Sequence, residues 1–346
     1  MAKVRMRDVA LDAGVSTMTV SHVVNGKDSQ VSAETMARVQ SSIRRLGYIR
    51  DEAAKTLGST RVNGKRQSNL IGVLIPQTEE GKEFMFSNPF YGDFLSAVEF
   101  TARVNGYHLL ISGTDVDQSY TEIAKARSLD GIIILGMLPS TDLVKYKSSQ
   151  IPTVLVDCYN SDYFFHSVGI NDRLGGYMAT KYLLEKGHKR IAIVTGAVNE
   201  VGVNQMRLHG YKDAIREAGI EFNETLVLRG KVNHEFGLVA AEKIARSGLS
   251  ITAVFATADI IALGMLKGFR KMGLLIPDDI SVIGFDDIYM TQICDPALTT
   301  VKQDITEKGK AAAEIIIAAA KDSKLTRREI TIPVSITERD SVRMIN

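Results

Sequence analysis

Residues 7–26, RDVALDAGVSTMTVSHVVNG, predict two short helices joined by a turn at Gly14. A helix-turn-helix needs a small residue where its helices cross, and Ala10 supplies it. The turn needs a positive φ, which glycine adopts at no steric cost. Ser16 is a favourable N-cap for the second helix. The stretch therefore predicts a helix-turn-helix, with a helical hairpin of purely packing function as the alternative.

The side chains of the second helix divide between two faces. Its inward face carries Val20, Val23 and Val24, and its outward face carries Thr17, Met18, Ser21 and His22. Asn25-Gly26 ends this helix, and Ser32 begins a third. The third helix repeats apolar residues at helical spacing as far as Gly47: Met36, Val39, Ile43 and Leu46. We therefore expect a unit of three helices.

Positive charge is concentrated at the N-terminus. Residues 1–69 contain 12 Lys or Arg and 6 Asp or Glu, a net charge of +6, whereas the remaining 277 residues contain 30 and 34, a net charge of −4. A basic head on a mildly acidic body indicates that a polyanion is bound by the head. DNA is the polyanion that a helix-turn-helix binds.

From residue 70 onward, short apolar strands alternate with amphipathic helices. The predicted strands form two series, at 70–76, 108–114, 131–136 and 153–158, and then at 190–196, 225–230, 253–258 and 280–287. Apolar strands that alternate with helices predict parallel sheets covered on both faces. Two such series predict two doubly wound subdomains with a ligand site at the carboxyl ends of their strands. Residues 51–69, which contain glycine, serine and basic residues, predict a hinge between head and body.

The remaining sequence features bear on other classes of protein. The start of the chain lacks the apolar run of a signal peptide, and no stretch has the length and apolarity of a membrane span. Cys158 and Cys294 lie far apart in apolar surroundings, which favours a reducing cytoplasm. The sequence has no phosphate-binding glycine loop, nucleophile elbow or histidine cluster, so we expect no enzyme activity, no cofactor and no metal. The alternatives are an extracytoplasmic sugar-binding protein and a doubly wound enzyme.

Several motifs, in order, resemble the LacI/GalR family of bacterial repressors. They are the segment from RDVALDAGVSTMTVSHVVNG to RDEAAKTL, then NPFYGDFLSAVEFTARVNGY, GGYMATKYLLEKGHKRIAIVTG, MRLHGYKDAIREAGI, PDDISVIGFDD and PALTTVKQD. The resemblance implies an N-terminal all-α helix-turn-helix head and an α/β core that is similar to periplasmic binding proteins. We expect the head at 1–50, a hinge helix and linker at 51–69, one core subdomain at 70–172 plus 301–329, and the other at 173–300 plus 330–346.

The resemblance also implies which residues bind DNA. Thr17, Met18 and His22 match positions that contact base edges, and Ser16, Thr19, Ser21 and Asn25 match positions that contact phosphates. His22 stands where the family usually has arginine, so we expect a different operator base pair beneath it. Arg5 replaces the usual threonine cap, and both Arg5 and Arg7 are candidate phosphate contacts. Leu57 matches the leucine that the family inserts into the minor groove.

For the ligand, three charged residues at the ends of strands and one in the segment NQMRLHGY match pocket positions of the family. They are Asp157, Arg207, Asp259 and Asp286. Carboxylate and guanidinium groups suit adjacent sugar hydroxyls. For Asp259 the alternative is a purely structural role at the start of the following helix. Phe90 and, second, Phe86 are the candidates for an aromatic face against the ligand.

The resemblance implies a homodimer that binds a pseudo-palindromic DNA operator and responds to a small molecule. We expect a sugar, with a nucleobase, a nucleoside or a sugar phosphate as alternatives. The chain ends soon after EITIPVSITERDSV without a leucine heptad, which favours a dimer over a tetramer. The sequence leaves open whether the ligand induces or corepresses, and whether a phosphocarrier protein takes part. We expect the protein in the bacterial cytoplasm, associated with the nucleoid when it is bound to DNA.

Overall fold

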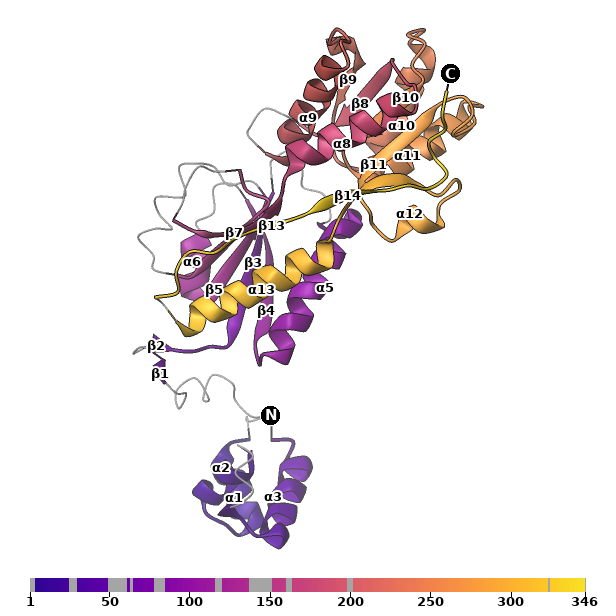
Figure 1. Ribbon diagram of the computed structural model, residues 1–346. Coiled ribbons are helices and arrows are strands. Elements are labelled where there is room, and N and C mark those ends of the chain that lie inside the picture. The colour runs from indigo at the N-terminus through magenta and orange to yellow at the C-terminus, as the bar shows by residue number, and fades with distance from the viewer. Residues whose placement is uncertain are drawn as a thin grey trace. The chain divides into compact units, whose positions relative to one another are not determined.

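The computed structural model describes residues 4–24, 30–48, 61–62, 65–77, 85–115, 120–136, 151–159, 164–197, 202–322 and 324–345. The chain divides into two compact units, Met1–Gln67 and Ser68–Asn346 (Figure 1). Within the part of the chain that the structure describes, no helix combines the length and apolar character needed to cross a membrane.

The first unit contains the predicted helices α1 (Met6–Ala13), α2 (Thr17–Val24) and α3 (Ala33–Leu46). Gly14 follows α1 with a φ of 63°, as the turn requires. The side chain of Ser32 accepts a hydrogen bond from the N–H of Thr35 at 3.3 Å and so caps α3. The helices meet around a small buried core of Val9, Ala10, Ala13, Val20 and Val39. The expected three-helix unit is confirmed.

An ion pair and a short hairpin complete the described part of the first unit. The guanidinium of Arg45 on α3 lies 2.5 Å from the carboxylate of Asp12 on α1, and the pair ties the two helices together. Strands β1 (Arg61–Val62) and β2 (Lys65–Arg66) pair in antiparallel fashion at the end of the expected linker. The hinge helix expected from residue 51 lies outside the described residues.

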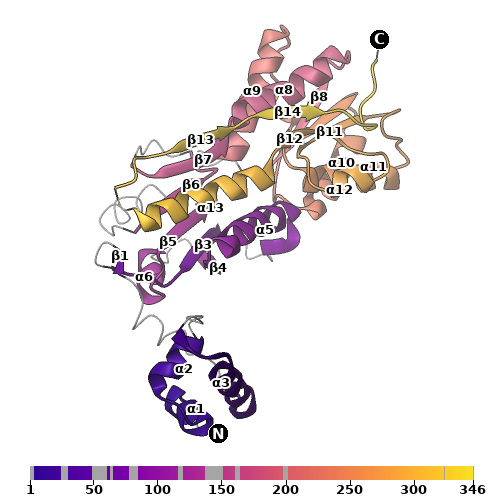
Figure 2. The same ribbon diagram turned by 60° about the horizontal axis from the view of Figure 1, so that its bottom comes forward.

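The second unit begins with a parallel sheet of six strands. They are β3 (Leu70–Gln77), β4 (His108–Asp115), β5 (Gly131–Leu135), β6 (Thr153–Val156), β7 (His166–Ile170) and β13 (Glu329–Ile332), in the order β13-β7-β6-β5-β3-β4. Helices α5 (Pro89–Val104) and α13 (Ile305–Lys321) lie side by side on one face (Figure 2). The short helix α6 (Tyr120–Ala126) covers the other face, and the 3-10 turn η3 (Met85–Ser87) precedes α5.

Both faces of this sheet are buried, which explains its apolar strands. Val73 and Ile133 pack in the core cluster that includes α5 and α13, whereas Leu74 and Ile132 pack in the cluster that includes α6. This alternation follows from side chains that point to opposite faces along a strand. The N-terminal strand of the sheet is fixed by Asp130, whose carboxylate accepts hydrogen bonds from the backbone N–H groups at 68 and 69.

The second sheet also has six strands. They are β8 (Ile191–Thr195), β9 (Val227–Arg229), β10 (Ala253–Ala256), β11 (Ser281–Asp286), β12 (Thr299–Gln303) and β14 (Val334–Thr337), in the order β14-β12-β11-β10-β8-β9. All pairs are parallel except β12–β14. Helices α8 (Asp172–Glu185) and α9 (Val203–Glu217) cover one face, and α10 (His234–Arg246) and α11 (Asp259–Lys271) cover the other. The short helices η4 (Glu224–Leu226) and α12 (Met290–Ile293) lie in connections.

All eight predicted strands are present, but two expected subdomain boundaries fall inside strands. β12 pairs with β11 and β14 as far as Gln303, so residues 301–303 belong to the second sheet. β13 pairs with β7 as far as Ile332, so residues 330–332 belong to the first. Among the described residues, the chain therefore changes sheet at Asn171, Asp304 and Pro333. Strand pairing determines where the chain passes from one sheet to the other, because neither the sequence motifs nor the composition change at these positions.

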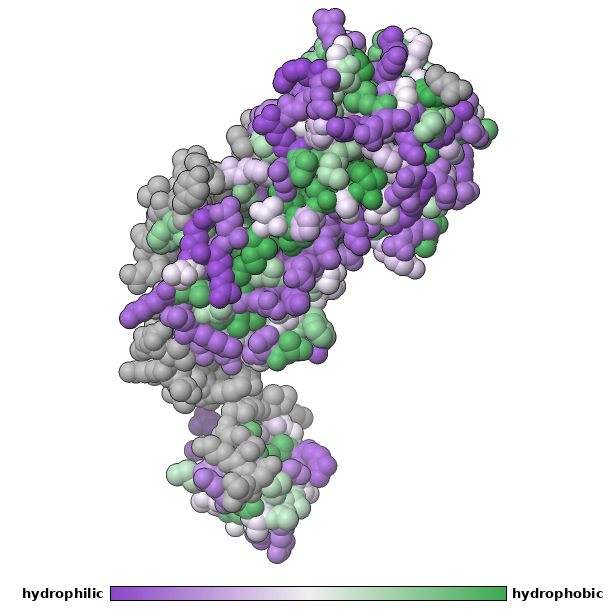
Figure 3. All heavy atoms as spheres, in the orientation of Figure 1, coloured by the Kyte–Doolittle hydropathy of each residue, from purple (hydrophilic) through white to green (hydrophobic). Residues whose placement is uncertain are grey.

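Most of the visible surface is hydrophilic, but apolar surface is present at the lower end of α5 (Figure 3). Phe100 and Val104 on α5 are exposed, and so is Ile111 on β4, the edge strand next to it. Scattered exposed apolar residues are normal, but a group of them beside the open side of an edge strand is typical of a surface that binds a partner.

Candidate functional site

The outward face of α2 presents three polar side chains and one methionine to solvent. Met18 is 66% exposed, Thr17 is also exposed, and Ser21 and His22 are half-buried. Val20 is fully buried between the helices and holds α2 in place. The four predicted outward residues therefore lie on the surface side of a helix that the head core fixes.

Ser16 has a structural function in addition to its predicted phosphate contact. Its hydroxyl oxygen accepts a hydrogen bond from the N–H of Thr19 at 3.1 Å, and the two hydroxyl groups are 2.9 Å apart. This is the N-cap geometry expected from the sequence. The free N–H groups at the start of α2 also favour an anion, so a DNA phosphate at this end is electrostatically suitable.

The two predicted N-terminal arginines are exposed. Arg5 is the N-cap of α1, but its side chain cannot cap the helix because a guanidinium has no hydrogen-bond acceptor. The backbone N–H of Arg5 donates to the carboxylate of Asp8 at 2.7 Å. Arg7 lies 3.6 Å from Asp8 in an exposed ion pair of little stabilising value. The predicted DNA contacts Asn25 and Leu57 lie outside the described residues.

In the second unit, three of the predicted ligand residues converge on one charged cluster. We use this name for Asp157, Asp172, Arg207, Asp286, Gln303 and Lys308. Asp157 directly follows β6 of the first sheet, whereas Asp286 and Gln303 end β11 and β12 of the second. The carboxyl ends of strands from both sheets therefore contribute to one site, as a doubly wound core predicts.

Lys308 on α13 connects the parts of the charged cluster. Its ammonium donates to the two carboxylate oxygens of Asp157 at 2.7 and 2.8 Å and to the side-chain oxygen of Gln303. The amide nitrogen of Gln303 in turn donates to Asp286 at 2.5 Å. Lys308 is 0% exposed, so this chain of contacts joins carboxylates of both sheets within the protein interior.

Arg207 is the second buried cation of the charged cluster. Its guanidinium donates to Asp172 at 2.7 Å and to the carbonyl oxygen of Thr257 at 2.5 Å, and it lies 3.6 Å from the carboxylate of Asp286. It also lies over the ring of Phe285, 3.6 Å from the ring centroid. Asp172 accepts a further hydrogen bond from the hydroxyl of Tyr159.

Close packing of two helices places Arg207. A Cβ atom at Gly176 on α8 would lie 2.2 Å from the carbonyl oxygen of Arg207, and one at Gly210 on α9 would lie 2.0 Å from that of Arg173. Only glycine allows α8 and α9 to approach this closely. The approach brings the guanidinium on α9 to Asp172, the first residue of α8.

Burial and backbone strain mark the two carboxylates at strand ends. Burial raises the pKa of Asp286 to about 6, although Arg207, the hydrogen bond from Gln303 and Lys308 oppose the shift. Burial also raises the pKa of Asp157, against the effect of Lys308. Asp157 and Asp286 have positive φ values of 54° and 122°. Strain and shifted pKa values of this kind are concentrated at binding sites.

The two aromatic candidates differ in their surroundings. Phe90 is half-buried, the Lys308 ammonium lies 5.5 Å from its ring centroid, and Tyr91 packs edge-on against it. Phe86, in η3, is 61% exposed. Phe90 is therefore beside the charged cluster, as expected of the first choice.

Asp259 is bound by neighbouring protein groups. It is fully buried at the start of α11, where its carboxylate accepts from the hydroxyl of Thr300 at 2.6 Å and from the N–H of Ile288 at 3.1 Å. Burial raises its pKa well above the usual range. Asp259 thus joins α11 to the loop after β11, and its contact with a ligand stays a prediction.

Sequence reasoning missed Asp172, Gln303 and Lys308. Lys308 had a readable signal, because it lies on the apolar face of α13 among Ile305, Ala312 and Ile316, where a lysine is rare unless paired. Gln303 lies within the family motif PALTTVKQD, where nothing in the local sequence marks it as a buried residue. Lys308 and Gln303 lie five residues apart, but their other partners and those of Asp172 are 13 or more positions away, so these contacts had no local signal.

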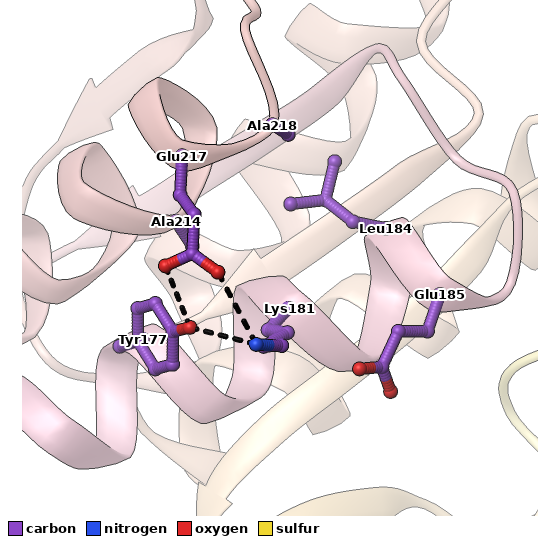
Figure 4. A pocket seen from close by; sticks show the side chains of 7 residues that line it. All are labelled: Tyr177, Lys181, Leu184, Glu185, Ala214, Glu217 and Ala218. Carbon is purple, nitrogen blue, oxygen red and sulfur yellow. Dashed lines mark hydrogen bonds and ion pairs between the residues drawn. The ribbon is translucent and has the colours of Figure 1, made fainter.

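A separate pocket of about 220 Å³ lies between α8 and α9 (Figure 4). Tyr177, Lys181 and Glu217 form a triangle of hydrogen bonds at its edge, with Tyr177–Glu217 at 2.8 Å and Lys181–Tyr177 at 2.9 Å. It contains none of the predicted ligand residues, and its polar groups bind one another. It carries no functional assignment.

Two family models match the chain. The model described as bacterial regulatory proteins, lacI family, matches residues 5–51, and the model of a periplasmic binding protein-like domain matches residues 180–342. The HTH-type transcriptional repressor PurR of Vibrio vulnificus is 33% identical over 347 residues, which cover 99% of each chain. The ribose operon repressor of Escherichia coli is 32% identical over 343 residues, 97% of this chain and 99% of the repressor.

The fold also matches a solved structure over its whole length. A lac repressor dimer bound to operator and an anti-inducer superposes with a TM-score of 0.81 at 24% identity, covering 99% of this chain and 100% of the other. At this identity the likeness supports the fold: a helix-turn-helix N-terminus followed by two α/β subdomains.

Proposed function

This chain belongs to the lacI family of bacterial regulatory proteins, and from that premise we propose how it binds DNA and which ligand it senses. It is a ligand-responsive, DNA-binding transcriptional repressor. In our proposal a homodimer binds a pseudo-palindromic operator in the cytoplasm, one head to each half-site, and a sugar binds at the charged cluster. A phosphocarrier-protein partner stays a prediction.

The observation that carries the proposal is the meeting of charged groups from both sheets in one buried cluster. Asp157 comes from the first sheet and Asp286 from the second, and Gln303 and Lys308 lie on either side of a point where the chain changes sheet. A ligand that binds Asp157 and Asp286 together would favour one angle between the subdomains. That preference sets the size of the response, typically about 1–3 kcal/mol.

A sugar suits these groups for chemical reasons. Carboxylates and a guanidinium accept from and donate to adjacent hydroxyls, and the ring of Phe90 offers a flat apolar face beside them. Arg207, Asp157, Asp286 and Phe90 are our proposed ligand contacts, with Phe86 and Asp259 as the weaker candidates. The name of the ribose operon repressor indicates a sugar-linked operon for that relative.

For DNA, we propose that Thr17, Met18 and His22 contact base edges and that neighbouring hydroxyls and Arg5, Arg7 contact phosphates. The exposed group of Phe100, Val104 and Ile111 supports a second copy of the chain as partner, and a two-fold dimer explains a palindromic operator.

Selection of operators from a random duplex library tests the proposal. We expect a palindromic site whose affinity falls steeply with salt, because bound phosphates release counterions. His22→Arg should change the preferred base at one position per half-site, a discrimination of about 1–3 kcal/mol. Gln40→Arg, an exposed site on α3, adds the same charge elsewhere and should leave the base preference unchanged.

The ligand part is tested separately by thermal shift against sugars, nucleosides and sugar phosphates, followed by operator binding with each hit. We expect a sugar to change operator affinity about 5- to 150-fold. Selection that yields no palindrome, or a hit that leaves operator affinity unchanged, would contradict the corresponding half of the proposal.

A further inference from the structure

Every hydrogen of the Lys308 ammonium has an acceptor within the protein. Two point to the carboxylate of Asp157 and one to the side chain of Gln303, at distances that leave no room for another strong acceptor. Because Lys308 is fully buried, an incoming group could reach this ammonium only by displacing Asp157 or Gln303.

The second cation of the charged cluster is also paired with carboxylates of the cluster. Arg207 binds Asp172, Thr257 and, more distantly, Asp286, and one face of its guanidinium is covered by the ring of Phe285. Among the described residues of the charged cluster, both cations are thus held by protein acceptors. The three carboxylates Asp157, Asp172 and Asp286 outnumber the two cations by one.

This charge balance determines which ligands the charged cluster can hold. A phosphate or carboxylate would enter a buried region of net negative charge, where both described cations of the charged cluster are already paired with carboxylates. Burial of a charge without a partner is costly, whereas an uncharged hydroxyl can donate to the remaining lone pairs of the carboxylates.

We propose that Asp157 and Lys308 together determine ligand specificity: the charged cluster accepts an uncharged, hydroxyl-bearing ligand and rejects the phosphorylated form of the same compound. Asp157 does so by occupying the ammonium of Lys308, which would otherwise bind an anion. The inference rests on the proposed function, because it assumes that the effector binds at the charged cluster. It narrows the alternatives by excluding sugar phosphates.

Asp157→Asn tests the proposal, since it frees the Lys308 ammonium and makes the charged cluster neutral. The matched control is the double variant Asp157→Asn with Lys308→Met, which removes the freed cation and restores the excess of one negative charge. Both are compared with the unaltered full chain by thermal shift. The probes are inorganic phosphate, ribose with ribose 5-phosphate, and glucose with glucose 6-phosphate.

We expect phosphorylated probes to stabilise the unaltered chain only through phosphate bound at the head, a gain that all three proteins share. Asp157→Asn should gain about 2–4 °C from at least one of them at a tenfold excess over its Kd, and the double variant should lose that gain. The head is identical in all three proteins, so phosphate bound there changes their melting temperatures equally. If the Lys308→Met double variant does not fold, Lys308→Gln with Asp157→Asn replaces it, because glutamine keeps a hydrogen-bond donor without the charge.

Stabilisation of the unaltered chain by a phosphorylated probe, with the gain lost in Asp157→Asn, would overturn the proposal. Equal responses of Asp157→Asn and the double variant would overturn it too. Failure of the proposed function is a separate result, because it would appear as absent operator selection by the unaltered chain, both without ligand and with each stabilising compound. That measurement involves neither substitution.

Discussion

The outward face of α2 and the charged cluster are both polar, yet they are built in opposite ways. On α2, Thr17 and Met18 stand in solvent, and local caps such as Ser16 hold the helix. In the charged cluster, Lys308 and Arg207 are buried and bound to several partners each. The outward face of α2 is accessible to a partner, whereas the side chains of the charged cluster are already held in place by one another. We therefore expect substitutions on α2 to affect recognition, and substitutions in the charged cluster to affect the stability of the core as well.

The largest effect is expected from Arg207→Met. Loss of the guanidinium leaves Asp172 and Asp286 buried without their cation, which typically costs about 3–5 kcal/mol. Chemical denaturation of the full chain, followed by circular dichroism, measures the change. Arg216→Met is the control, because Arg216 lies on the same helix with an exposed side chain and should change stability by less than about 0.5 kcal/mol. Similar losses of stability in both variants would contradict the expectation that the charged cluster stabilises the core.

A smaller effect is expected from pH, through Asp286. Its pKa is raised to about 6 in the folded protein, against about 3.9 in an unfolded chain. Between these values the folded state binds more protons, so this group's contribution to stability falls as pH rises through 6. It should be about 1.3 kcal/mol more favourable at pH 5 than at pH 7.

Asp286→Asn isolates this contribution, because half-buried His166 and buried His188, whose pKa values are lowered by burial, act in the opposite direction as pH falls. Melting temperatures of both proteins are recorded from pH 5 to pH 7, and that of the unaltered chain should rise relative to that of the variant as the pH is lowered. Parallel curves would show that Asp286 does not titrate in this range.

The smallest effect is expected from Ser16→Ala, which removes the N-cap of α2. It should weaken the helix by about 1 kcal/mol, visible as faster hydrogen exchange in peptides that cover α2. Ser41→Ala, at an exposed position within α3, should leave exchange there unchanged or slower. Unchanged exchange in α2 would mean that the core residue Val20, rather than the cap, determines its stability.

Much of the fold could be predicted because its signals are local. The positive φ at Gly14 and the caps at Ser16 and Ser32 depend on residues a few positions apart, and all three are confirmed. The points where the chain passes from one sheet to the other were predicted less accurately. Whether residues 301–303 and 330–332 join one sheet or the other depends on strand partners far along the chain.

The sequence by itself determined the helix-turn-helix, the two series of strands and the family to which the chain belongs. Apolar residues at helical spacing and short continuous apolar runs can be read directly from the order of the side chains. Only the tertiary structure decided that Lys308 binds Asp157, a residue 151 positions away, and that Gln303 carries the connection to Asp286. Such pairings arise when sheets and helices pack, because packing removes water and forces each buried charge to find a partner.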